Sequence, residues 1–235
     1  MKFMIALTAG ILLLALPAFS ILKKKRNMRE ATLLNDAALP GMTGPMVADT
    51  LDQLGYFKYA GTDKRDSLKK EIADTYDRAK VLATLYGNTR PYQPFCYRLY
   101  SCDGETLFEY GGIVEYLQDI KPTFDKMHIP LTWENERFSE NGREHSIFIN
   151  GKKYFAYEGD PGSLKAWGIA TKNFVEMIND QLSIHQSDER LYPILFNNDG
   201  QIVFLTRPQY DFISKHFDPT ERPMAPGLWW KTFGR

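Results

Sequence analysis

The chain has 235 residues, of which 43% are hydrophobic and 25% are charged, a composition typical of a globular protein rather than a disordered one. It has 29 basic and 29 acidic residues, but residues 1–29 hold six of the basic ones and none of the acidic ones. Residues 30–235 therefore carry 23 basic against 29 acidic residues. This net charge of −6 argues against a nucleic-acid partner, whose phosphates require a basic surface.

The amino-terminal segment predicts a membrane anchor. Residues 3–22 contain no charge, and a helix of that length spans about 30 Å, the thickness of a bilayer core. The basic run KKKR follows at residues 23–26, and basic residues beside a membrane span stay on the cytoplasmic side. We therefore expect residues 1–29 to form a single-pass anchor that contacts the lipid bilayer through residues 3–22 and leaves the domain in the cytoplasm.

A secretory signal is the alternative for the same segment. Ala18 and Ser20 place small residues at the spacing of a cleavage site, and the domain would then be exported to the periplasm or the cell surface. Cys96 and Cys102 favour the cytoplasm, because they lie on one predicted strand and about 20 Å of extended chain separates them. Two thiols that cannot pair suit a reducing compartment.

The rest of the chain divides into three predicted parts. Residues 30–45 contain several turn-forming glycines and prolines and are expected to be a juxtamembrane linker. A soluble α+β domain follows at residues 46–218, and residues 219–235 form a tail rich in proline and aromatic residues. The domain begins with two predicted helices, at residues 45–55 and 66–86, where apolar residues recur every three or four positions.

Three hairpins are predicted in the domain. Alternating strands flank Asp103-Gly104, Asn150-Gly151 and Asp199-Gly200, which are favoured hairpin turns. A helical pattern follows each hairpin, and residues 131–138 predict one more strand. A hairpin with one apolar face needs a helix to cover it. We therefore predict an α+β fold with an antiparallel or mixed sheet of five to seven strands. Its helices pack mainly on one face, and a hydrophobic helix precedes it at the amino terminus.

Sequence signatures of catalysis, metal binding or nucleotide binding are missing from the chain, so we expect no cofactor and no metal. If the protein is an enzyme, exported or membrane-bound, its first candidates are His145, Glu134, Glu136 and Asp160, which cluster around the central hairpin. The two glutamates alternate on a predicted strand, so both are expected on one face. Gly111-Gly112, just before a helix, offers backbone donors to an anion.

The tail supplies the candidate binding residues Trp229, Trp230 and Phe233. Its prolines favour an extended conformation, and its aromatic side chains need a surface on which to bury. That surface is the tail's own domain, a partner or a membrane surface. Together with the anchor, these features favour a membrane-tethered protein-binding or accessory domain, with a protein partner of unknown identity.

Overall fold

The structure is a computed structural model that describes residues 41–87, 93–163, 165–195 and 200–234. The predicted anchor and most of the predicted linker lie outside these residues, so the amino-terminal hydrophobic helix stays a prediction. Within the described part of the chain, no helix has both the length and the apolarity that a membrane crossing requires. Met42–Arg235 forms one compact unit.

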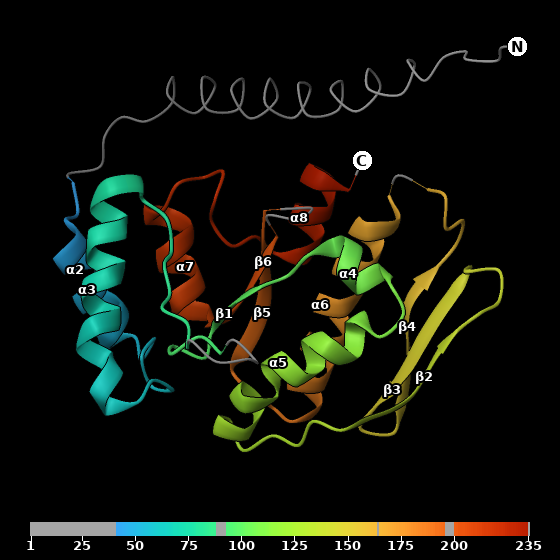
Figure 1. Cartoon of the computed structure of the whole chain (residues 1–235). Helices are drawn as coiled ribbons and strands as arrows, with labels where there is room; N and C mark the ends of the chain where they lie inside the picture. The colour runs from blue at the N-terminus through green and yellow to red at the C-terminus, as the bar shows by residue number, and fades with distance from the viewer. Residues whose placement is uncertain (1–40, 88–92, 164, 196–199, 235) are drawn as a thin grey trace, which may run out of the picture. The chain divides into compact units, whose positions relative to one another are not determined.

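The described residues confirm the α+β class, but they form two three-stranded antiparallel sheets rather than one larger sheet (Figure 1). The strand orders are β1-β6-β5 and β2-β3-β4. The elements in chain order are α2 (Gly44–Gln53), α3 (Thr62–Ala79), β1 (Leu99–Ser101), α4 (Gly104–Phe108), α5 (Gly112–Lys126), β2 (Trp133–Phe138), β3 (Glu144–Ile149), β4 (Lys152–Glu158), α6 (Ala166–Ile184), β5 (Glu189–Ile194), β6 (Gln201–Thr206), α7 (Arg207–His216) and α8 (Pro226–Phe233).

The β1-β6-β5 sheet is covered by helices on both faces. In β6, Ile202 and Phe204 pack into a core with α5 and α6, whereas Val203 and Leu205 pack into a second core with α2, α3 and α7. Strands buried on both faces are apolar at successive positions, and β6 reads QIVFLT. For this sheet the expectation of helices on one face is therefore wrong.

The β2-β3-β4 sheet fits that expectation, because one of its faces packs on α6 while the other carries exposed side chains. Its β3–β4 hairpin is confirmed: the turn residues Asn150 and Gly151 have φ values of 49° and 77°, the positive values that a tight hairpin turn requires. Strands β5 and β6 also form an antiparallel pair, as predicted, although Asp199 of their turn lies outside the described residues.

The hairpin predicted at Asp103-Gly104 is wrong. Asp103 is the N-cap of α4, where its Oδ1 accepts a hydrogen bond from the Glu105 amide at 2.9 Å. Strand β1 instead pairs with β6, with Leu99 opposite Val203. Gly104 suits this close packing, because a Cβ there would lie 3.0 Å from Thr171 Oγ1 and 3.2 Å from Trp167 O of α6, nearer than ordinary van der Waals contact. The residue pair thus starts a helix that lies close against α6.

Two other predicted elements differ from the structure. Helix α3 ends at Ala79, well before the predicted terminator Gly87, because Lys80 adopts the left-handed conformation with φ 58°. The tail was expected to be extended, but residues 226–233 form helix α8 with Pro226 in its first turn, a position that tolerates proline.

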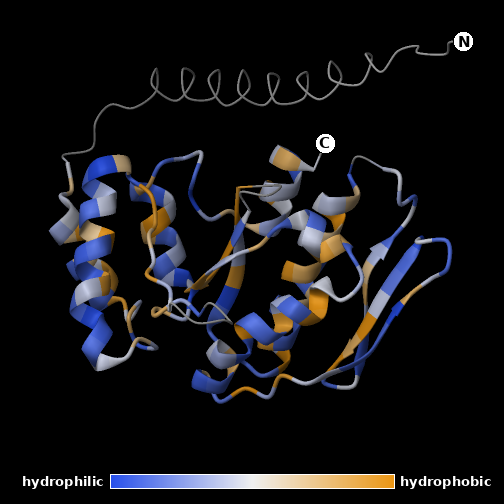
Figure 2. Ribbon diagram, viewed as in Figure 1, coloured by the Kyte–Doolittle hydropathy of each residue, from blue (hydrophilic) through white to orange (hydrophobic). Residues whose placement is uncertain are grey.

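Helix α6 lies between the two sheets and bonds to the open edge of each. Asn173 Nδ2 donates to Ala156 O of β4 at 3.0 Å. Asn179 both donates to Leu191 O of β5 at 2.8 Å and accepts from Leu191 N at 2.7 Å. Figure 2 shows the hydrophobic segments gathered where α5, α6 and the sheets meet. The two asparagines thus give edge strands the partners that they would otherwise seek in another chain.

Candidate functional site

The predicted enzyme residues are only partly brought together. His145 Nε2 lies 2.8 Å from Glu136 Oε1. Glu134 does not join them, because a bulge between Glu134 and Arg137 breaks the two-residue alternation of β2. The register therefore places Glu136 on the core side with His145, and Glu134 on the outer face. Asp160 lies in the exposed loop after β4 and accepts a hydrogen bond from Gly162 N.

We call His145, Glu136 and the Gly111 amide the His145 cluster. The His145 side chain is fully buried, and that of Glu136 is 9% exposed. Glu136 Oε1 also accepts from Gly111 N at 3.2 Å, so the anion at the start of α5 is the protein's own carboxylate. His145 Nδ1 is buried without a hydrogen-bond partner. This closed cluster joins β2, β3 and α5 and offers no acid–base pair to a substrate in solvent.

An open site lies elsewhere, where three helices end. Helices α2, α5 and α6 all finish in a Schellman motif, in which two amides beyond the helix bond back to its last carbonyls. In α5, for example, Ile129 N donates to Phe124 O at 3.0 Å and His128 N donates to Asp125 O at 3.1 Å. The left-handed residues of the three motifs are Gly55, His128 and Gln186, with φ values of 76°, 58° and 54°.

The segments that follow these helices enclose a groove of about 640 Å³, which we call the helix-end groove. This volume falls in the range of small-molecule and side-chain binding sites. Its lining comes from the three helix ends: Lys58, Tyr59, Lys126, Met127, His128, Ile129, His185, Gln186, Ser187 and Asp188. The lining therefore carries two lysines and two histidines against one carboxylate.

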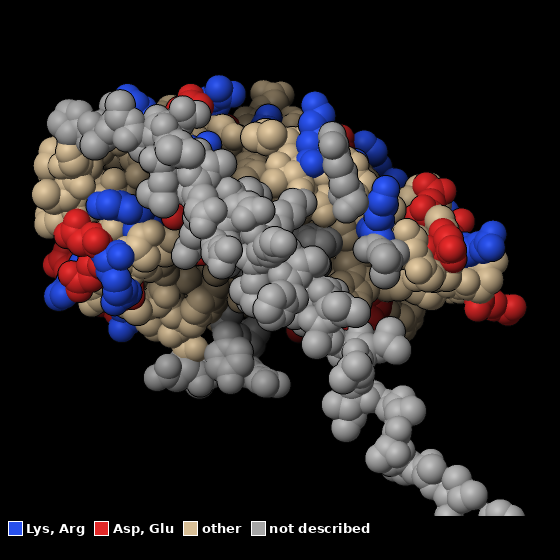
Figure 3. All heavy atoms as spheres, turned by 90° about the horizontal axis from the view of Figure 1, so that it is seen from above, with Lys and Arg blue, Asp and Glu red and all other residues tan. Residues whose placement is uncertain are grey.

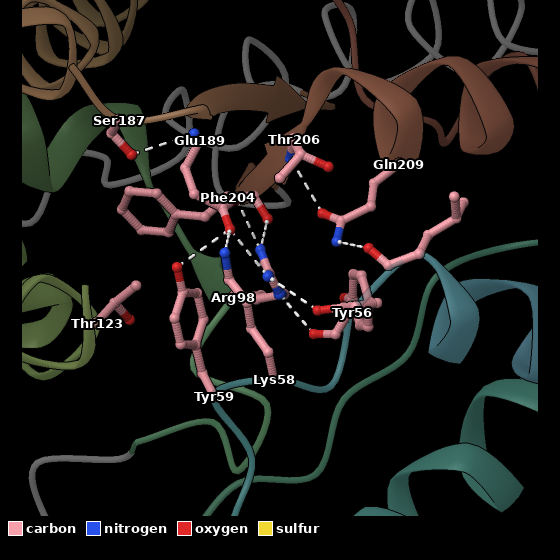
Figure 4. A network of polar contacts seen from close by, with 12 residues as sticks. Tyr56, Lys58, Tyr59, Arg98, Thr123, Ser187, Glu189, Phe204, Thr206 and Gln209 are labelled. Carbon is pink, nitrogen blue, oxygen red and sulfur yellow. Dashed lines mark hydrogen bonds and ion pairs between the residues drawn. The ribbon is translucent and has the colours of Figure 1, made fainter.

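Behind the groove lies a buried ion pair, Arg98 with Glu189, whose side chains are 0% and 1% exposed. Arg98 Nη1 and Nη2 donate to the two carboxylate oxygens at 2.8 and 2.9 Å. The guanidinium also donates to the carbonyls of Gly55, Tyr56 and Phe204 (Figure 4). Arg98 thus satisfies carbonyls at the end of α2 and fixes that end to β5 and β6.

Glu189 connects this pair to the groove. Its Oε1 accepts from Tyr59 Oη at 3.1 Å and lies 2.9 Å from Lys58 Nζ, whose side chain is 40% exposed. Burial alone would raise the pKa of the Glu189 carboxyl, but Arg98 and then Lys58 lower it below its ordinary value. Burial, and next the charge of Glu189, raises the pKa of Tyr59 to about 12. We call Arg98, Glu189, Lys58 and Tyr59 the Arg98 cluster.

The groove contains two strained backbone positions. His128 and Gln186 hold the left-handed conformation that glycine adopts at lower cost, and α2 does use glycine, Gly55, at the equivalent position. Strain of this kind often marks a functional site, because the surrounding structure must maintain it. Here it keeps an imidazole and an amide at the rim of the groove.

The predicted tail residues lie apart from this groove. Trp229 is fully buried and its Nε1 donates to Leu195 O at 2.6 Å, so this side chain packs on its own domain. Trp230 and Phe233 are half-buried. A Cβ on Gly234 would lie 2.1 Å from the Trp230 ring, so a glycine is required beside it.

Sequence reasoning missed the helix-end groove and the Arg98 cluster. Of the three helix ends, only that of α2 was expected from its terminating residue, Gly55. His128 and Gln186, at the ends of α5 and α6, are not residues that signal a helix end. Comparisons of the chain with protein-family models, with curated proteins and with solved structures find no match.

Proposed function

We propose that the chain is a membrane-tethered, non-catalytic binding domain whose helix-end groove holds a carboxylate-bearing segment of a protein partner. The observation that carries this proposal is the charge at the floor of the groove: Lys58 and the buried Arg98 share one carboxylate, that of Glu189. These three groups leave one positive charge uncompensated, and the partly exposed Lys58 presents it to the groove.

The charged residues at the rim of the groove leave this local excess unchanged. Lys126 and Asp188 cancel each other in sign, so the lining and the Arg98 cluster together carry +1 in a domain whose net charge is −6. A carboxylate is therefore drawn to this groove although the rest of the domain repels it. A cationic ligand would be repelled by the two lysines of the lining.

The C-termini of the three helices disfavour an anion in the groove, but only weakly. A helix C-terminus carries a partial negative charge, whose interaction with a nearby ion is worth about 0.3–1 kcal/mol. The Schellman bonds already occupy two carbonyls of α5 and two of α6, and Arg98 satisfies those after α2. A hydrogen bond from an ammonium to a carboxylate is worth about 1.5–3 kcal/mol, so the lysines outweigh the helix ends.

A binding role suits the open groove better than catalysis suits the His145 cluster. The groove is accessible, whereas His145 is closed off and Glu134 lies on the opposite face of its sheet. Among the described residues, no three or more His, Cys, Asp or Glu side chains are placed to hold a metal ion. A tether to the membrane would raise the local concentration of the domain, so a modest affinity would suffice.

Site-specific photo-crosslinking of the full chain in cells tests this proposal. A photoreactive residue replaces Asp188 at the rim of the groove, and in a control replaces the exposed Asp74 on α3. We expect position 188 to crosslink one discrete protein and position 74 not to do so. Lys126→Gln should weaken that crosslink severalfold, and Lys172→Gln on α6 should leave it unchanged.

Crosslinks that are equal at both positions, or that survive Lys126→Gln and Lys58→Gln together, would overturn the proposal. Thermal melting of each variant checks that the fold is intact. Lys58→Gln leaves the Arg98–Glu189 pair in place, so its effect on folding is expected to be small.

A further inference from the structure

Helix α8 presents apolar side chains to solvent at the end of an acidic domain. Leu228 is 54% exposed, and the half-buried Trp230 and Phe233 lie on the same short helix. From residue 223 to residue 235 the chain contains Lys231 and Arg235 but no acidic residue. Leucine, tryptophan and lysine without carboxylates make up the composition of helices that lie in the membrane interface.

Buried contacts hold α8 in a fixed position. Trp229, on the inner side of the helix, is fully buried and bonds to Leu195 O. Met224, just before the helix, donates from its amide to Pro193 O of β5 at 3.0 Å. The outer side of α8 is therefore a fixed surface of the domain.

The chain enters the domain on the same side as α8. Gly44 N donates to Asp77 Oδ1 near the end of α3, and Lys80 O accepts from Asp218 N at 2.8 Å. Asp218 lies eight residues before the start of α8 in the chain. Figure 1 shows the start of α2, the end of α3 and α8 along one side, with the ends of α5 and α6 toward the opposite side.

The charge on this side also suits a lipid surface. Figure 3 looks down on it and shows Lys and Arg as well as Asp and Glu among the coloured residues, and α8 itself carries Lys231 and no acidic residue. Anionic lipid headgroups attract basic residues near the surface. If residues 3–22 span a bilayer, residues 30–43 keep the domain within about 50 Å of it even when this segment is fully extended.

We infer that the outer side of α8 lies on the bilayer that anchors the chain, with Leu228 and Lys231, which lie one helical turn apart, among the headgroups of anionic phospholipids. This inference rests on the membrane anchor of the proposed function. One short helix would bind a bilayer weakly by itself, but the anchor supplies a high local concentration of lipid. With α8 on the membrane, the helix-end groove faces away from it, toward soluble partners.

The test uses the full chain reconstituted in vesicles of phosphatidylcholine and phosphatidylglycerol. An environment-sensitive fluorophore is attached to Leu228→Cys, and in matched controls to Phe155→Cys and Asp188→Cys, which replace other exposed side chains. Cys96 and Cys102 are buried, so they should not react in the folded protein. We expect a blue-shifted emission, quenched severalfold by spin-labelled lipids, at position 228 and at neither control position.

Each outcome has a separate meaning. If the protein does not float with the vesicles, the anchor itself fails, and with it the tether in the proposed function. If it floats but the probe at position 228 emits as in water, only the inference about α8 is overturned. If that probe is shielded in cells yet not quenched by lipid in vesicles, α8 binds a protein instead, which also overturns the inference.

Discussion

The Arg98 cluster and the His145 cluster are both buried, yet they differ in how many of their polar atoms have a hydrogen-bond partner. Arg98 donates to two carboxylate oxygens and three carbonyls, whereas His145 has Glu136 as a partner on one ring nitrogen and none on the other. A guanidinium stays charged inside a protein, so each of its donors must be satisfied there. An imidazole can stay neutral and tolerates an unmet nitrogen. The number of satisfied polar atoms thus differs between the clusters because a guanidinium cannot become neutral, whereas an imidazole can.

Removing Arg98 should have the largest effect on folding. Arg98→Met leaves the carboxylate of Glu189 buried with only Lys58 and Tyr59, and breaking a buried ion pair costs about 3–5 kcal/mol. We expect a loss of that size in the free energy of unfolding, measured by urea denaturation. The double variant with Glu189→Leu should recover much of it, because no unpaired charge remains buried and Lys58, whose side chain is 40% exposed, stays solvated. A loss below about 1 kcal/mol in the single variant would contradict this account.

Asp119 sharpens the comparison, because it is a partly buried carboxylate whose main perturbations both disfavour its charge. Burial, and next the charge of Glu115, raises its pKa to about 6. Since the pKa is higher in the folded state, ionisation of Asp119 lowers stability as the pH rises from about 4 to above 6. Asp119→Asn should therefore stabilise the protein by about 1 kcal/mol at pH 7.5, after allowance for partial exposure, and have little effect at pH 4. Thermal unfolding at both pH values checks this, and an equal gain at both would contradict it.

The strained positions in the groove give a smaller effect. His128→Gly should stabilise the fold by about 0.5–1 kcal/mol, because glycine adopts the left-handed conformation at lower cost. Lys80→Gly at the end of α3 is the matched control, since Lys80 also has φ 58° but lies outside the groove lining. Both variants should melt at a higher temperature, and only His128→Gly should weaken the crosslink from position 188. If both weaken it equally, His128 has no role in binding.

His145→Phe should change stability least. The variant loses one hydrogen bond to a carboxylate, worth about 1.5–3 kcal/mol, but it also removes a buried nitrogen without a partner, whose burial costs about 1–3 kcal/mol. We expect an unfolding free energy close to that of the parent protein, measured by urea denaturation. A loss as large as that of Arg98→Met would mean that the two clusters are equally essential to the fold.

Local chemistry in the sequence predicted part of this fold. Asn150-Gly151 is a short-range signal, and the structure contains its hairpin. Asp103-Gly104 failed because the same residue pair can cap a helix, and distant packing against α6 decides between the two. Burial on both faces of the β1-β6-β5 sheet likewise depends on helices far away in the chain.

The candidate sites were harder to predict than the fold. Arg98 alternates with apolar residues on its predicted strand and thus resembles an exposed side chain, while its partner Glu189 is 91 positions away. His145 and Glu136 were both candidate residues in the sequence, so their pairing could have been predicted. The bulge that separates Glu134 from them has no clear signal in the sequence. The groove requires three helix ends to meet, which no single segment encodes.

The pairing of β1 with β6 has a consequence for biosynthesis. About 100 residues separate the two strands. Because a ribosome adds about 5–20 residues per second, β6 is synthesised about 5–20 seconds after β1. During that interval Arg98 lacks Glu189 and Phe204, and the apolar side chains of β1 have no strand to cover them. The α2–α3 hairpin can form early from local contacts, but the central sheet is completed only after most of the chain has been synthesised.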